Sequence, residues 1–94
     1  MSHDPRVLVV DDEAAIHRFL TPALMANDYD VIKAMTAGEA LKRIATDAPD
    51  IVVLDLGLPD MDGKEVISRV REWSDVPIIG LSARDRAAEK SEAR

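Results

Sequence analysis

Three short runs without polar side chains alternate with longer stretches of helical periodicity, and this alternation constrains the fold more than any other feature. The runs are Val7–Val10, Ile51–Leu54 and Ile78–Leu81. A short apolar run is typical of a strand that is buried on both faces of a parallel sheet. Helices between such strands must cover both faces of that sheet. The pattern therefore predicts a three-layer α/β fold, a parallel sheet between helices, formed by one domain over residues 1–94.

The segments between these runs supply a weaker strand and three helices. Residues 29–34 predict a second strand, and Thr36 with Glu39 forms a capping-box pattern that opens a helix. The first helix is expected to bury a stripe of five residues: Ile16, Phe19, Leu20, Ala23 and Leu24. His17 is offset from this stripe, so we expect it at the surface. A third helix is expected to bury Val66, Ile67 and Val70.

Composition excludes several classes of protein. The 94 residues contain no cysteine, which rules out disulfides and thiolate zinc sites. A net charge of −6 argues against a general nucleic-acid surface in this chain. No apolar run approaches the roughly 20 residues of a membrane span, and the polar start of the chain is not a signal peptide. We therefore expect a cytoplasmic protein without a membrane partner.

Acidic residues follow two of the predicted strands. Asp11 and Asp12 come directly after the first strand, and Asp55 comes directly after the third. Ligands of open α/β sheets bind at the carboxyl ends of the strands. If the first and third strands are neighbours, the three carboxylates converge there. Carboxylates about 5 Å apart repel by roughly 3 kcal/mol at an effective dielectric constant near 20, so we expect a cation between them. Oxygen ligands favour Mg²⁺, Mn²⁺ or Ca²⁺ over zinc, and Mg²⁺ fits best because it retains waters.

Each of these residues also has a simpler interpretation. Asp12 can cap the first helix, and Asp11 can be a solvated loop acid. Asp55 is harder to explain this way, because an acid among apolar residues is costly to bury unpaired. Ser82 follows the fourth strand and can either donate to a phosphoryl oxygen or cap a helix. Gly57 can offer a carbonyl to a metal or be an ordinary turn residue.

Taken together, four segments resemble the receiver domains of two-component response regulators. The segments are Val9–Glu13, Leu54–Pro59, Asp62–Gly63 and Leu81–Arg84. The winged-helix branch of this family includes the Kdp-type regulators of potassium transport, which the chain resembles most at Asp55–Gly63, Arg71–Ser74, Val76–Pro77 and Leu81–Arg84. The resemblance covers nearly the whole chain. It implies a flavodoxin-like sheet of strand order 2-1-3-4-5.

The resemblance also implies roles for the site residues. Asp55 would accept a phosphoryl group from a sensor histidine kinase, and Ser82 would be the switch hydroxyl. Mg²⁺ would bind Asp12, Asp55 and the Gly57 carbonyl, with Asp11 acting largely through a water. Such a domain is a phosphoacceptor rather than an enzyme that turns over substrate, and it contacts DNA only through an effector domain.

The sequence departs from the family pattern at its end. The family has a fifth strand that carries a lysine, followed by a fifth helix, and the chain ends at Arg94 before both. Lys90 does not replace that lysine. We therefore expect a truncated receiver of order 2-1-3-4, whose exposed fourth strand or tail promotes self-association.

Two other functions remain open. One is a receiver-like interaction module that is never phosphorylated. The other is a Mg²⁺-dependent aspartyl phosphatase, although such enzymes commonly carry a second acid where this chain has Gly57.

Overall fold

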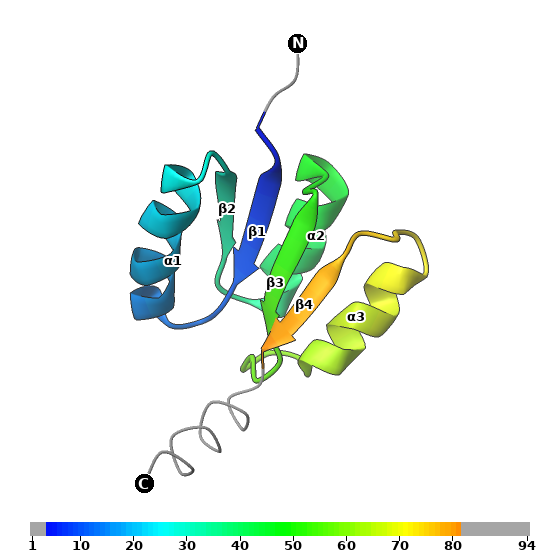
Figure 1. Cartoon of the computed structure of the whole chain (residues 1–94). Coiled ribbons are helices and arrows are strands. Elements are labelled where there is room, and N and C mark those ends of the chain that lie inside the picture. The colour runs from blue at the N-terminus through cyan, green and yellow to red at the C-terminus, as the bar shows by residue number, and fades with distance from the viewer. Residues whose placement is uncertain (1–3, 82–94) are drawn as a thin grey trace, which may run out of the picture.

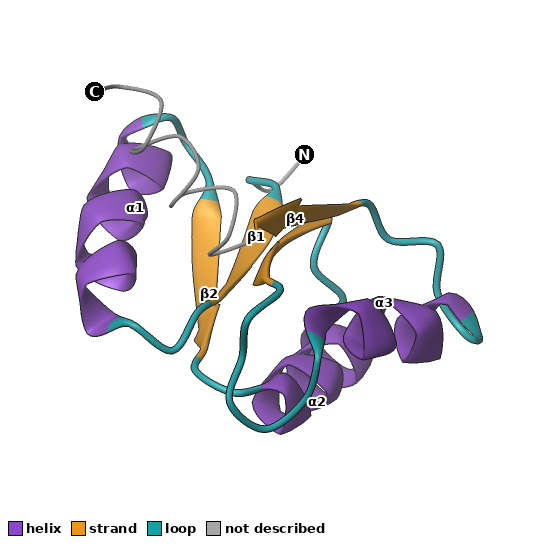
Figure 2. Ribbon diagram, turned by 90° about the horizontal axis from the view of Figure 1, so that it is seen from below, coloured by secondary structure: helices purple, strands orange, loops and turns teal. Residues whose placement is uncertain are grey.

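The computed structural model describes residues 4–81 and contains a four-stranded parallel sheet in the order β2-β1-β3-β4 (Figure 1). The elements follow one another as β1 (Arg6–Val10), α1 (Ala14–Ala26), β2 (Asp30–Ala34), α2 (Ala37–Asp47), β3 (Ile51–Asp55), α3 (Gly63–Arg71) and β4 (Ile78–Leu81). Helix α1 covers one face of the sheet, while α2 and α3 cover the other (Figure 2). The predicted three-layer α/β fold and its strand order are thereby confirmed.

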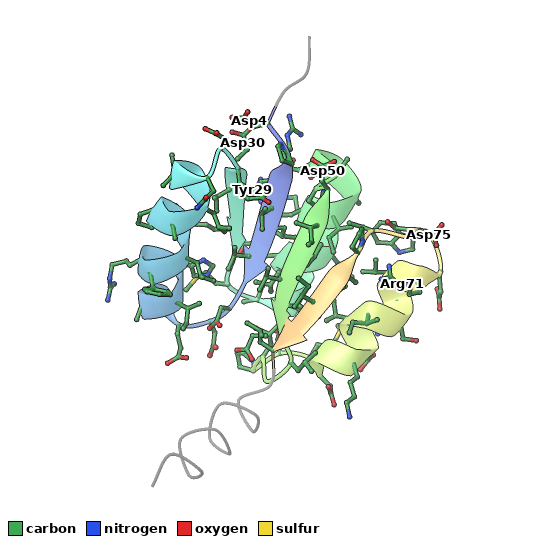
Figure 3. All side chains as sticks on the ribbon, viewed as in Figure 1. Asp4, Tyr29, Asp30, Asp50, Arg71 and Asp75 are labelled. Carbon is green, nitrogen blue, oxygen red and sulfur yellow. The ribbon has the colours of Figure 1, made fainter. Side chains whose placement is uncertain are left out.

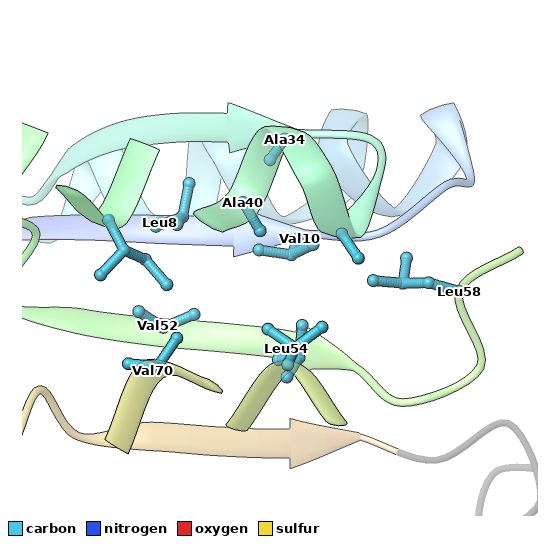
Figure 4. Packing of buried hydrophobic residues seen from close by; sticks show 11 residues of the cluster. Leu8, Val10, Ala34, Ala40, Val52, Leu54, Leu58 and Val70 are labelled. Carbon is cyan, nitrogen blue, oxygen red and sulfur yellow. The ribbon is translucent and has the colours of Figure 1, made fainter. Parts of the chain in front are cut away.

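Strand β1 lies in the middle of the structure and is buried on both faces. Residues alternate between the faces of a strand, and Leu8 and Val10 join the hydrophobic cluster under α2 and α3 (Figure 4). Val7 and Val9 are equally buried, at 3% and 1% exposure, but lie outside this cluster. Both faces of β1 therefore need apolar residues, which is why the run contains no polar side chain.

Helix α1 is rotated relative to the predicted stripe. Ile16, Leu20 and Leu24 are partly buried as expected, but Phe19 is 74% exposed. His17 is only 4% exposed, so the prediction of a surface histidine is wrong. The inner face of α1 thus runs through His17 and Thr21 rather than through Phe19 and Ala23.

The two following helices begin with side-chain caps. Thr36 Oγ1 accepts the Glu39 N–H over 3.1 Å, as the capping box predicts. The Glu39 carboxylate, however, accepts from the Met35 N–H over 2.8 Å instead of from Thr36 itself. Asp62 caps α3 by accepting the Lys64 N–H over 2.9 Å. Residues in loops thus fix where both helices start.

Strand β4 pairs with β3 alone among the described residues. Ile78 packs against the core cluster under α3, whereas Ile79 on the opposite face is 49% exposed. Ser82 and the predicted tail lie outside the described residues. Within residues 4–81, no helix is long and apolar enough to cross a membrane.

Candidate metal and phosphoacceptor site

The sheet topology brings three aspartates together at its carboxyl end. Strands β1 and β3 are direct neighbours, and Val10 is in register with Leu54. The next residues, Asp11 and Asp55, therefore leave the sheet side by side. One carboxylate oxygen from each of Asp11, Asp12 and Asp55 lies within 4.8 Å of the others. We call these three residues the acidic cluster.

Three other aspartates lie far from the acidic cluster. Asp4, Asp30 and Asp50 lie at the amino ends of the strands, at the opposite edge of the sheet (Figure 3). Among the described residues, the acidic cluster is the only group of three or more potential ligands close enough together to share a metal ion. The three aspartates therefore converge as predicted from sequence, and they do so only at the carboxyl ends of the described strands.

Asp11 is held at three points. Its N–H donates to the Ala34 carbonyl of β2 over 3.1 Å. Its Oδ1 accepts the Glu13 N–H over 2.9 Å, and its own carbonyl lies 2.8 Å from His17 Nε2. Asp11 is 2% exposed, so it is not a solvated loop acid. The helix cap residue is Glu13 rather than Asp12, so the exposed Asp12 carboxylate is not explained by capping.

Asp55 is fixed by the turn that follows it. Its Oδ1 accepts the Gly57 N–H over 2.9 Å, and the Leu56 N–H donates to the Leu81 carbonyl of β4 over 2.8 Å. The side chain is only 3% exposed. This turn aims the Asp55 carboxylate toward the other two acids instead of into solvent.

The chemistry of the acidic cluster fits a hard divalent cation. Two carboxylates within 4.8 Å of each other repel by roughly 3 kcal/mol at an effective dielectric constant near 20. Two of the three are nearly inaccessible to water, so solvent compensates this repulsion poorly. Three carboxylate oxygens, one of them on the exposed Asp12, would leave other coordination positions of a bound metal ion for waters. Mg²⁺ commonly keeps several waters in this way.

Sequence reasoning missed the contacts of two residues, His17 and Asp60. His17 contacts the Asp11 carbonyl from inside α1. Asp60, in the loop after β3, accepts the N–H groups of Ala37 and Gly38 at the start of α2, over 2.9 and 3.1 Å. These two bonds lower the pKa of Asp60, and the one from Ala37 has the larger effect. A carboxylate at a helix N-terminus is a known pattern, but a partner 23 residues away gives no local sequence signal.

With this site and fold, the chain belongs to the response regulator receiver domain family, whose family model matches residues 7–94. Its relatives point to one branch of that family. The chain is 50% identical over 84 residues to the KDP operon transcriptional regulatory protein KdpE of Escherichia coli, covering 89% of this chain and 37% of that protein. It is 47% identical over 87 residues to KdpE of Mycobacterium tuberculosis, covering 93% of this chain and 38% of that protein. The chain thus spans little more than a third of these relatives.

Solved receiver domains share the fold. The receiver domain of the Francisella response regulator 1452 superposes with a TM-score of 0.81 at 34% identity, covering 95% of this chain and 74% of that one. The response regulator TrrA of Thermotoga maritima, solved in complex with Mg²⁺ and BeF, gives a TM-score of 0.78 at 38% identity, covering 84% and 70%. The family predicted from sequence is therefore confirmed: the chain is a response regulator receiver domain.

Proposed function

We propose that Asp55 accepts a phosphoryl group from a phosphohistidine on a sensor kinase. An Asp55 carboxylate oxygen would form the new P–O bond in line as the P–N bond to the histidine breaks, leaving the electron pair on the departing imidazole. The convergence of Asp55 with Asp11 and Asp12 within 4.8 Å carries this proposal.

The same residues would hold Mg²⁺. Asp12, Asp55 and the Gly57 carbonyl would be its direct ligands, and Asp11 would act largely through a bound water. Bound Mg²⁺ would compensate the negative charge of the acids and of the incoming phosphoryl group. The Mg²⁺ and BeF in the structure of the related TrrA protein support this choice of metal. Ser82 would act as the switch hydroxyl beside the new phosphate.

Mass spectrometry after incubation with acetyl phosphate and Mg²⁺ tests the proposal. The chain should gain the mass of one phosphoryl group, and Asp55→Asn should gain none. Asp75→Asn serves as the matched control, because Asp75 is an exposed acid remote from the cluster (Figure 3). Modification of Asp55→Asn to the wild-type extent would place the phosphoryl group elsewhere and refute the assignment.

Two other outcomes separate the alternative functions. Mg²⁺ binding without any phosphoryl gain would favour a non-phosphorylated interaction module. Repeated hydrolysis of a chromogenic phosphate ester would favour an aspartyl phosphatase. Against the phosphatase, the residue two positions after Asp55 is Gly57, which has no side chain to carry a proton.

In the intact protein, we propose that this domain acts in the cytoplasm and controls transcription of a potassium-transport operon through a separate DNA-binding effector domain. The likeness to KdpE proteins of three species supports this role. A reporter fused to that operon should lose its response to potassium limitation when the intact protein carries Asp55→Asn. An unchanged response would refute the assignment to this operon.

We also propose that the 94-residue chain self-associates through β4 or the tail. Among the described residues, β4 has a strand partner on one side only, and Ile79 and Leu81 are 49% and 37% exposed. A strand with an unpaired edge and apolar side chains promotes pairing with another chain. Sedimentation equilibrium should show a dimer or larger species that Ile79→Lys dissociates. A stable monomer at high concentration would refute this proposal.

A further inference from the structure

His17 is a buried polar residue for which the phosphoacceptor chemistry has no direct use. It lies in the first half of α1 and is 4% exposed. Its Nε2 is 2.8 Å from the Asp11 carbonyl oxygen, and its Nδ1 has no hydrogen-bond partner among the described residues. A carbonyl oxygen can only accept a hydrogen bond, so Nε2 must carry the proton and donate.

This hydrogen bond acts on the peptide group between two members of the acidic cluster. The Asp11 carbonyl and the Asp12 N–H belong to one planar peptide unit. Fixing the carbonyl oxygen therefore fixes the direction in which the chain continues to the Asp12 Cα. The Asp12 carboxylate is exposed and lacks the surrounding packing that orients Asp11 and Asp55, so its position depends on the backbone that carries it.

We propose that His17 is a positioning residue for the metal site: its Nε2–H holds the Asp11–Asp12 peptide so that the Asp12 carboxylate faces Asp11 and Asp55. The inference rests on the proposed metal-binding function of the acidic cluster. It gives the buried ring a role although its Nδ1 has no partner in the described structure, since its Nε2 supplies the bond to the Asp11 carbonyl. Groups that orient metal ligands commonly affect metal affinity by about 10- to 100-fold.

Magnesium affinity of the 94-residue chain, measured by calorimetry without any phosphodonor, tests the role. His17→Leu removes the donor and keeps apolar bulk, and we expect it to weaken Mg²⁺ binding by about 10-fold or more. His17→Gln offers an amide N–H in place of Nε2–H and should restore most of the affinity. Thr21→Val is the matched control, because it removes a buried hydroxyl one turn further along the same helix face without touching Asp11. Its Mg²⁺ affinity should equal that of the wild type.

The outcomes separate this inference from the proposed function. If Asp12→Asn and Asp55→Asn weaken Mg²⁺ binding but His17→Leu does not, the metal site stands and the role of His17 is refuted. Equal losses in His17→Leu and His17→Gln would also refute it, because the donor would then be irrelevant. If neither aspartate variant weakens binding, the metal site and this inference both fail.

A measurement on the unmodified chain covers the case in which a variant does not fold. Imidazole ¹⁵N spectra at a pH where the ring is neutral should show the proton of His17 on Nε2. The His17 signals should shift when Mg²⁺ is added, because the metal would bind the side chain of Asp12, whose peptide group includes the Asp11 carbonyl that the ring contacts. A proton on Nδ1 would exclude donation to the Asp11 carbonyl and overturn the proposal.

Discussion

Gly63, at the start of α3, lies directly against Leu56: a Cβ on Gly63 would be 2.5 Å from the Leu56 Cα. The Gly63 N–H also donates to the Leu56 carbonyl over 3.1 Å. Leu56 is the residue after Asp55, so this contact sets how closely α3 approaches the turn that holds Asp55. The neighbouring atom is backbone and cannot rotate out of the way.

Gly63→Ala should therefore destabilise the chain by about 1–3 kcal/mol or more, because the added methyl group must displace the backbone at Leu56. Mg²⁺ affinity should fall as well, since Asp55 moves with its neighbour. Gly38→Ala is the control: its Cβ would meet only Asp60 Oδ2 at 3.9 Å, and it should be neutral or stabilising by up to about 1 kcal/mol. Urea unfolding measures both variants, and equal stabilities would contradict the prediction.

Asp60 should give the domain a pH dependence in the acid range. The N–H groups of Ala37 and Gly38 lower the pKa of Asp60 below its ordinary value of 3.8. A lowered folded-state pKa means that this carboxylate stabilises the fold fully above the unfolded-state pKa and loses the effect as the pH falls through the folded-state pKa. The stability of Asp60→Asn relative to the wild type should therefore improve as the pH falls below about 4. Thermal unfolding across this range tests it; a constant difference would contradict it.

Ala48 ends α2 in the left-handed conformation, with φ of 47°. The Cβ of an alanine is sterically strained in this region, whereas glycine has no Cβ. Ala48→Gly should therefore raise stability by about 0.5–1 kcal/mol. Ala45→Gly, at an exposed position within the same helix, should lower it by about the same amount. Chemical unfolding should give opposite signs for the two variants, and destabilisation by both would contradict this account of Ala48.

Magnesium should stabilise the fold through the acidic cluster. At a Mg²⁺ concentration 100-fold above the dissociation constant, the gain is about 2.7 kcal/mol. Without Mg²⁺, Asp55→Asn should be more stable than the wild type by about 1–3 kcal/mol, because it removes carboxylate repulsion. The same variant should respond little to Mg²⁺. Thermal unfolding with and without the metal checks both effects, and an Asp55→Asn chain that Mg²⁺ stabilises fully would contradict them.

The acidic cluster could be predicted from sequence because the carboxyl ends of parallel strands lie at the same end of a sheet. Once β1 and β3 are neighbours, Asp11, Asp12 and Asp55 have little freedom to lie apart. The roles of Asp55 as phosphoacceptor and of Ser82 as switch remain predictions, and Ser82 lies outside the described residues.

The surroundings of the cluster could not be predicted in the same way. The partly buried stripe of α1 is formed by Ile16, Leu20 and Leu24. Because successive helical residues turn by about 100°, this stripe can be widened on one side by His17 and Thr21 or on the other side by Phe19 and Ala23. The rule that apolar residues are buried predicts that Phe19 faces the sheet. In the structure His17 faces the sheet instead, where its Nε2 contacts the Asp11 carbonyl. Asp60 and Gly63 depend on contacts between elements, which periodicity does not encode.

The two hydrogen bonds from the start of α2 to Asp60 also link distant parts of the domain mechanically. Asp60 lies five residues beyond Asp55, in the loop that follows β3. A loop that shifts when Asp55 changes its charge must either release both N–H groups or pull the first turn of α2 along with it. A change at Asp55 can therefore be transmitted to the first turn of α2 through Asp60.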